Sequence, residues 1–116
     1  MRLTVVSALA EGADRMVAEQ VFEEAARRGE AARLEAVIPF RKHRYAEKQG
    51  FTEESRAEFE HWLAQATSVL ELDLPWGQDV SYWAYEVAGR HVVTRCDVLL
   101  ALWNGQPGRG RGPGPY

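Results

Sequence analysis

The sequence lacks the features that mark several large classes of protein. It has one cysteine, Cys96, so no disulfide can form within the chain, and its apolar neighbours are typical of a small buried side chain. No apolar run approaches the length of a membrane span, and the N-terminus does not have the pattern of a signal peptide. From these absences we expect a cytoplasmic protein that does not bind a membrane.

An excess of basic residues is absent as well. The 14 lysines and arginines are outnumbered by 17 aspartates and glutamates, which gives a formal net charge of −3. Broad nucleic-acid binding normally needs a basic surface, so we do not expect nucleic acid to be the main partner. The three histidines, His43, His61 and His91, are scattered and have no clustered cysteines or acids beside them. The sequence therefore predicts neither a metal site nor a cofactor.

Apolar segments of strand length alternate with segments of helical periodicity. The expected strands are residues 3–6, 34–38, 68–72 and 98–103, and the expected helices are residues 13–28, 52–66 and 79–95. Residues 40–51 are basic and aromatic and are expected to form an irregular loop. This order predicts an α/β fold, a Rossmann-like three-layer sandwich whose mostly parallel sheet has about four strands. It would occupy residues 1–104, followed by a disordered Gly/Pro/Arg-rich tail at 105–116.

The strongest candidate site is the corner that follows the first expected strand. Small residues and one glycine precede a helix there, so backbone amides can approach an anion at the positive end of the helix. Phosphate would lie against the amides from Gly12, and Glu11 or Asp14 would accept hydrogen bonds from ribose hydroxyls. Two carboxylates beside a phosphate are electrostatically unfavourable, so we expect one of them to point away. The predicted contact residues are Ser7, Ala8, Glu11, Gly12, Ala13 and Asp14. The structural alternative is that Gly12 only forms a tight turn and Asp14 only serves the helix start.

Two further segments carry candidate ligand contacts. A glycine-rich loop follows Trp103, and its amides and arginine could hold an anion; its candidate residues are Gly105, Gly108, Arg109 and Gly110. The alternative for this loop is a frayed tail. Tyr45 follows a short basic run, and its ring could stack on a base beside the pocket. The alternative for this run is a solvated loop.

Three segments in this order resemble the SLOG superfamily, Rossmann-like domains that include DNA processing protein A and the Lonely Guy phosphoribohydrolases. The segments are 5–15, then 34–40 with Tyr45, and 88–105. The resemblance implies that a nucleotide or nucleotide-derived ligand binds at the carboxyl edge of the sheet. In such families an attached or neighbouring effector protein often reads out the binding, so the resemblance implies a sensor module.

The chain departs from the family pattern at both ends, so we expect a truncated member. Bacterial relatives begin with an extra strand, which would lie between the strands at 3–6 and 68–72 here. Without it, an inner row of backbone groups must pair again or bind another chain, including a second copy of this one. Relatives also continue the C-terminal loop into a helix that bears a glutamate, and this chain has no such helix.

Recognition of a ligand is the function we expect, and two alternatives stay open. A nucleoside 5′-monophosphate phosphoribohydrolase would need an acid–base carboxylate and an arginine, for which Glu11 and Arg109 are the candidates. The missing glutamate helix weakens this alternative. Binding of single-stranded DNA conflicts with the acidic balance of the chain.

Overall fold

The structure, a computed structural model, describes residues 3–76 and 81–95. Its elements in chain order are β1 (Leu3–Ser7), α1 (Ala13–Arg27), β2 (Ala32–Ile38), α2 (Lys42–Gln49), α3 (Glu53–Gln65), β3 (Ser68–Glu71) and α4 (Ser81–Arg95). The predicted α/β fold is confirmed, because parallel strands alternate with helices along the chain. None of the described helices is long and apolar enough to cross a membrane.

The described sheet has three strands in the order β1-β2-β3, and both pairings are parallel. Val5 lies opposite Leu34 in the first pairing, and Ala36 lies opposite Val69 in the second. The expectation that the strands at 3–6 and 68–72 flank a missing strand was wrong, since β2 itself lies between them. Both edges of β2 are therefore hydrogen-bonded. The predicted strand at 98–103, the tail at 105–116 and Cys96 lie outside the described residues.

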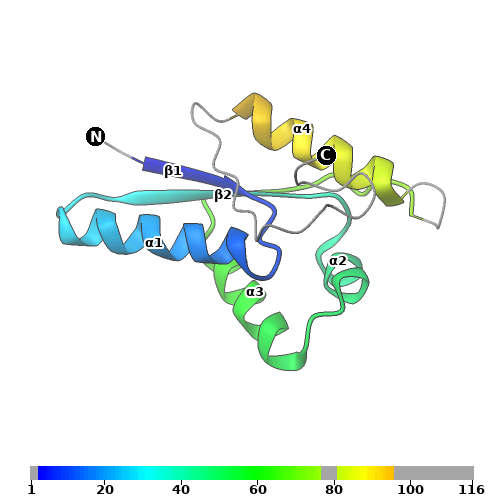
Figure 1. The fold of residues 1–116 in the computed structure, drawn as a ribbon, viewed down its shortest axis with the longest axis horizontal. Coiled ribbons are helices and arrows are strands. Elements are labelled where there is room, and N and C mark those ends of the chain that lie inside the picture. The colour runs from blue at the N-terminus through cyan, green and yellow to red at the C-terminus, as the bar shows by residue number, and fades with distance from the viewer. Residues whose placement is uncertain (1–2, 77–80, 96–116) are drawn as a thin grey trace, which may run out of the picture.

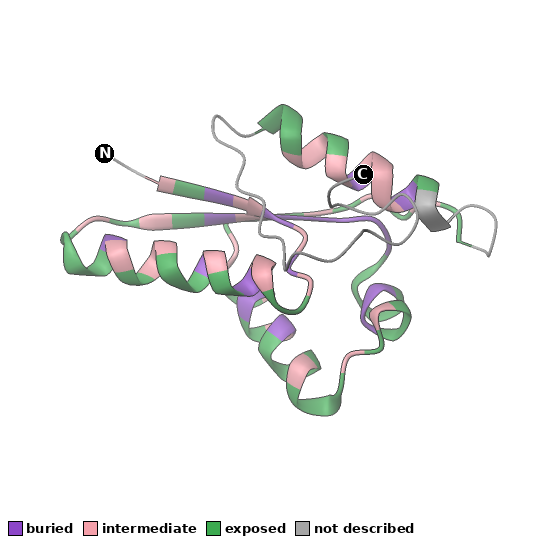
Figure 2. Ribbon diagram, viewed as in Figure 1, coloured by how far each residue is buried: buried purple, intermediate pink, exposed green. Residues whose placement is uncertain are grey.

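Helices cover both faces of this sheet. In Figure 1, α1 and α3 lie on one side of the strands and α4 lies on the other. The central strand β2 is the most buried element, with Leu34 and Ile38 fully enclosed, and Figure 2 shows buried residues along its second half. Phe59 and Trp62 of α3 belong to the same hydrophobic cluster. This packing fixes α3 close to the sheet and so positions the first turn of that helix.

Residues 40–51 contain the helix α2, so the prediction of an irregular loop was wrong. The start of α2 is capped by a residue distant in sequence: the Glu71 Oε2 accepts a hydrogen bond from the Lys42 amide at 2.7 Å. The helix ends at Gly50, whose φ of 70° is the left-handed conformation typical of a helix C-cap. Burial of Tyr45 anchors its inner face. Short-range sequence signals could not reveal a cap that comes from β3.

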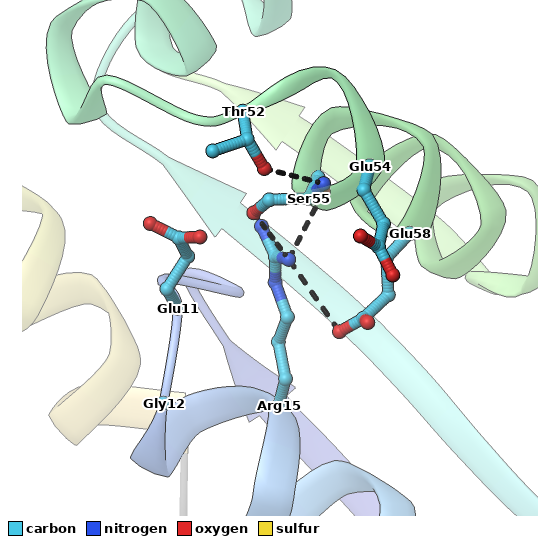
Figure 3. Close-up of a pocket in the computed structure, with 7 residues that line it drawn as sticks. All are labelled: Glu11, Gly12, Arg15, Thr52, Glu54, Ser55 and Glu58. Atoms are coloured by element: carbon cyan, nitrogen blue, oxygen red, sulfur yellow. Dashed lines mark hydrogen bonds and ion pairs between the residues drawn. The ribbon is translucent and has the colours of Figure 1, made fainter.

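The next helix, α3, begins where the sequence predicted. The Thr52 Oγ1 accepts a hydrogen bond from the Ser55 amide at 3.1 Å, so Thr52 is a side-chain N-cap. The apolar positions Phe59 and Trp62 are buried, as the helical spacing predicted. Thr52 and Ser55 thereby lie beside the turn that links β1 to α1, as Figure 3 shows.

Candidate functional site

Hydrogen bonds stabilise the turn between β1 and α1. The Ser7 Oγ accepts from the Leu9 amide at 3.0 Å, and the Arg15 Nε donates to the Leu9 carbonyl at 3.1 Å. Leu9 is fully buried with a φ of 56°, a left-handed conformation that costs a non-glycine residue on the order of 1–3 kcal/mol. Gly12 then turns the chain into α1 with a φ of 82°. The surrounding contacts keep this strained backbone in place.

The Asp14 carboxylate binds the backbone of the same turn. Its Oδ2 accepts a hydrogen bond from the Ala10 amide at 3.1 Å. Burial raises the pKa of Asp14 above its ordinary value, while the Ala10 hydrogen bond and the nearby Arg15 charge lower it in part. Asp14 is thus engaged with the protein backbone, whereas Glu11 is exposed. The expectation that one of the two carboxylates points away from a ligand stays a prediction, for which Asp14 is the candidate.

Arg15 is a buried cation, only 5% exposed, that joins α1 to α3. Its Nη1 donates to the Ser55 carbonyl at 3.0 Å and to the Ser55 Oγ at 2.9 Å, and lies 3.4 Å from the Glu58 Oε1. The guanidinium carbon lies 4.6 Å from the centre of the Phe51 ring, a favourable cation–π position. Its Nη2 has no hydrogen-bond partner among the described residues. Arg15 therefore fixes the position of α3 relative to the β1–α1 turn.

A polar pocket of about 280 Å³ lies between this turn and the start of α3. Its lining consists mainly of charged and hydroxyl side chains: Glu11, Gly12, Arg15, Thr52, Glu54, Ser55 and Glu58. Figure 3 shows the Arg15 side chain between Glu11 on one side and the two α3 glutamates on the other. Most of the lining residues are exposed, so the pocket opens to solvent. A pocket of this size can hold part of a small ligand.

Two helix starts meet at the pocket. Gly12 is the N-cap of α1 and provides no side-chain cap, and Thr52 is the N-cap of α3. The first amides of a helix lack intrahelical acceptors and carry partial positive charge, which favours an anion close to Gly12. The glutamates can only accept hydrogen bonds, and they favour hydroxyl or amine groups on the rest of a ligand. Within residues 3–76 and 81–95, no group of acidic, histidine or cysteine side chains is placed to hold a metal ion.

Apart from Tyr45, the predicted contact residues fall into three groups. Glu11 and Gly12 line the pocket, and Ala13 starts the helix beside them. A second group does not line the pocket: Ser7 and Asp14 accept hydrogen bonds from the backbone of the turn, and Ala8 packs against the core. The remaining candidates, Trp103, Gly105, Gly108, Arg109 and Gly110, lie outside the described residues.

Tyr45 is part of the hydrophobic core. Its side chain is 1% exposed and its ring packs against those of Phe51, Phe59 and Tyr85. Burial raises the pKa of the Tyr45 hydroxyl, with a smaller contribution from the negative charge of Asp14. A ring enclosed in this way cannot stack on a base, so we assign Tyr45 a packing role.

Sequence reasoning missed most of the pocket wall. Arg15 precedes Ala18 by three positions and Phe22 by seven, which places it on the buried face of α1. A charged residue on an apolar helix face is a signal that could have identified it. The α3 residues Glu54, Ser55 and Glu58 carried no such signal, because only the packing of α3 against the sheet brings them to the turn.

Comparison with protein-family models, with curated proteins and with solved structures finds no match for this chain. The resemblance to the SLOG superfamily therefore stays a prediction, and the candidate function depends on the geometry of the pocket.

Proposed function

We propose that this domain binds a nucleotide or nucleotide-derived small molecule at the β1–α1 turn and recognises it without transforming it. One observation carries the proposal: the exposed Gly12 begins α1 without a side-chain cap and opens into a polar pocket. The turn follows the carboxyl end of a parallel strand, the place where open α/β sheets bind their ligands.

The charges of the pocket suggest how the ligand is oriented. A phosphate would lie against the first amides of α1 near Gly12, as far as possible from Glu54 and Glu58. Sugar hydroxyls would donate hydrogen bonds to Glu11 and to the α3 glutamates, since carboxylates accept such bonds. The volume of about 280 Å³ is at the lower limit for a ligand pocket, so a base would extend toward solvent.

Within the described residues, the engagement of Arg15 favours recognition over hydrolysis, while Arg109, the arginine candidate for a phosphoribohydrolase, lies outside them. A phosphoribohydrolase needs an arginine free to contact the substrate near the glycosidic bond. In this pocket the Nε and Nη1 of Arg15 are bound to Leu9 and Ser55. Because Arg15 connects the turn to α3, a ligand that contacts both would stabilise their relative position. An effector protein could then read this change, which is the behaviour of a sensor module.

Calorimetric titration with AMP, ribose 5-phosphate, 2-deoxyribose 5-phosphate and adenosine tests the proposal. We expect AMP and ribose 5-phosphate to bind, the deoxy sugar to bind less tightly and adenosine least tightly. Glu11→Gln should reduce the preference for ribose over deoxyribose, whereas Glu19→Gln, an exposed change on α1, should preserve it. Failure of all four compounds to bind would contradict the proposal. Release of adenine from AMP would establish the phosphoribohydrolase instead.

A further inference from the structure

A second charged feature lies on α2, outside the pocket. The Lys48 Nζ is 4.2 Å from the centre of the Trp76 ring, and the guanidinium carbon of Arg44 is 5.6 Å from the same ring. The indole is 46% exposed, and Arg44 and Lys48 are exposed as well. We name Arg44, Lys48 and Trp76 the α2 cluster.

The two cations of the α2 cluster differ from their basic neighbours in how their charge is balanced. Arg41 lies 3.5 Å from Asp73, and the Lys42 Nζ lies 3.4 Å from Glu60. No residue in the described part of the chain forms an ion pair with Arg44 or Lys48. Arg44 and Lys48 are four positions apart on α2, so their like charges repel each other. Cation–π attraction to the Trp76 ring keeps both charges close to the same indole. An anionic group between them would relieve this repulsion.

Two of the three residues of the α2 cluster, Arg44 and Trp76, are of types that are enriched at protein–protein interfaces. Tryptophan and arginine are enriched among the residues whose truncation most weakens binding. A half-exposed indole provides apolar contact area, and the two cations, which form no ion pair within the described residues, attract carboxylates. We propose that the α2 cluster is a docking site for an acidic segment of a partner protein.

Nucleic acid fits the α2 cluster less well than an acidic peptide. Both cations already lie near the Trp76 ring, so a stacked base would compete with them for it. Single-stranded nucleic acid also requires a long cationic groove, whereas in the described part of the chain α2 offers two cations without an ion pair, and acidic side chains, Asp73 and Glu71, lie against the start of the same helix. The formal net charge of −3 opposes a long polyanion further.

Fluorescence anisotropy of the full chain with two labelled probes tests this proposal. One probe is a capped peptide of alternating glutamate and alanine, and the other is an oligothymidylate of the same formal charge. We expect the peptide to bind more tightly than the oligothymidylate, with an affinity that decreases as salt increases. The double substitution R44Q/K48Q should weaken peptide binding by about fivefold, the loss expected for two exposed ion pairs. Trp76→Ala changes no charge but should also weaken peptide binding, because it removes the apolar contact area of the indole.

The matched control is Arg56→Gln, which removes one exposed positive charge from α3. Peptide binding should change less than about twofold in this variant. The proposal is overturned if the peptide does not bind at low salt, if Arg56→Gln weakens it as much as the double substitution, or if the oligothymidylate binds more tightly. All substituted side chains are exposed, and circular dichroism of each variant should be that of the parent chain. None of these outcomes depends on the pocket at Gly12.

Discussion

The Arg15 Nη1 donates hydrogen bonds to both the carbonyl oxygen and the Oγ of Ser55, although the two residues are 40 positions apart in the sequence. This pair joins the first turn of α1 to the first turn of α3. The pocket between the two helices exists because these turns are held next to each other. Arg15 is therefore both a wall of the candidate site and a part of the fold.

Arg15→Met should lower the free energy of unfolding by about 2 kcal/mol, because the Leu9 carbonyl and Ser55 lose their buried donor. The side-chain volume is largely kept, which limits any cavity. Urea denaturation measures the change. Arg56→Met on the exposed surface of α3 is the control and should alter stability by less than about 0.5 kcal/mol. Equal stability of the two variants would mean that the Arg15 hydrogen bonds contribute nothing net.

Gly12→Ala should destabilise the protein by about 1–2 kcal/mol. A Cβ at this position meets no atom within 4 Å, so the penalty comes from the φ of +82° and not from a clash. Gly89→Ala provides the matched comparison, since Gly89 lies within α4 and its Cβ would also meet nothing within 4 Å. Alanine there should stabilise the protein by about 0.5–1 kcal/mol. Thermal unfolding of both variants checks that the two changes have opposite signs.

Thr52→Ala should destabilise the protein by about 1 kcal/mol, because the Ser55 amide loses its cap at the start of α3. Thr67→Ala, at an exposed threonine just before β3, is the control and should have a smaller effect. The comparison uses urea midpoints of the two variants. If Thr67→Ala lowered stability more than Thr52→Ala does, the role assigned to the Thr52 cap would be contradicted.

The partly buried Asp14 predicts a pH dependence of stability. Burial raises the pKa of Asp14 in the folded protein above its ordinary value of 3.8, so the folded state binds this proton more tightly than the unfolded state. Its contribution is then most favourable below pH 3.8 and is lost as the pH rises through the folded pKa. Asp14→Asn keeps an acceptor for the Ala10 amide but does not titrate. Relative to this variant, the parent chain should lose stability between about pH 4 and neutral pH.

Urea denaturation at a series of pH values measures this difference. A gap between the two proteins that stays constant from acid to neutral pH would show that Asp14 has the same pKa in the folded and unfolded states.

Local sequence patterns identified most of the described elements. The helical spacing of Phe59 and Trp62 and the capping residue Thr52 predicted α3, because both signals depend on near neighbours in the chain. The small residues after β1 predicted the turn at Gly12 for the same reason. The helix α2 was missed because its first amide is capped by Glu71, which lies 29 positions away.

The sequence by itself determined the α/β class, the parallel strands and the turn at Gly12, since periodicity, capping and glycine act over a few residues. Only the tertiary structure decided that β2 lies in the middle of the described sheet and that Tyr45 belongs to the core. It also decided that α3 supplies half of the pocket wall. The physical reason is that burial and long-range hydrogen bonds, such as that between Arg15 and Ser55, depend on which faces pack together. The pattern of neighbouring residues in the sequence does not specify which faces pack together.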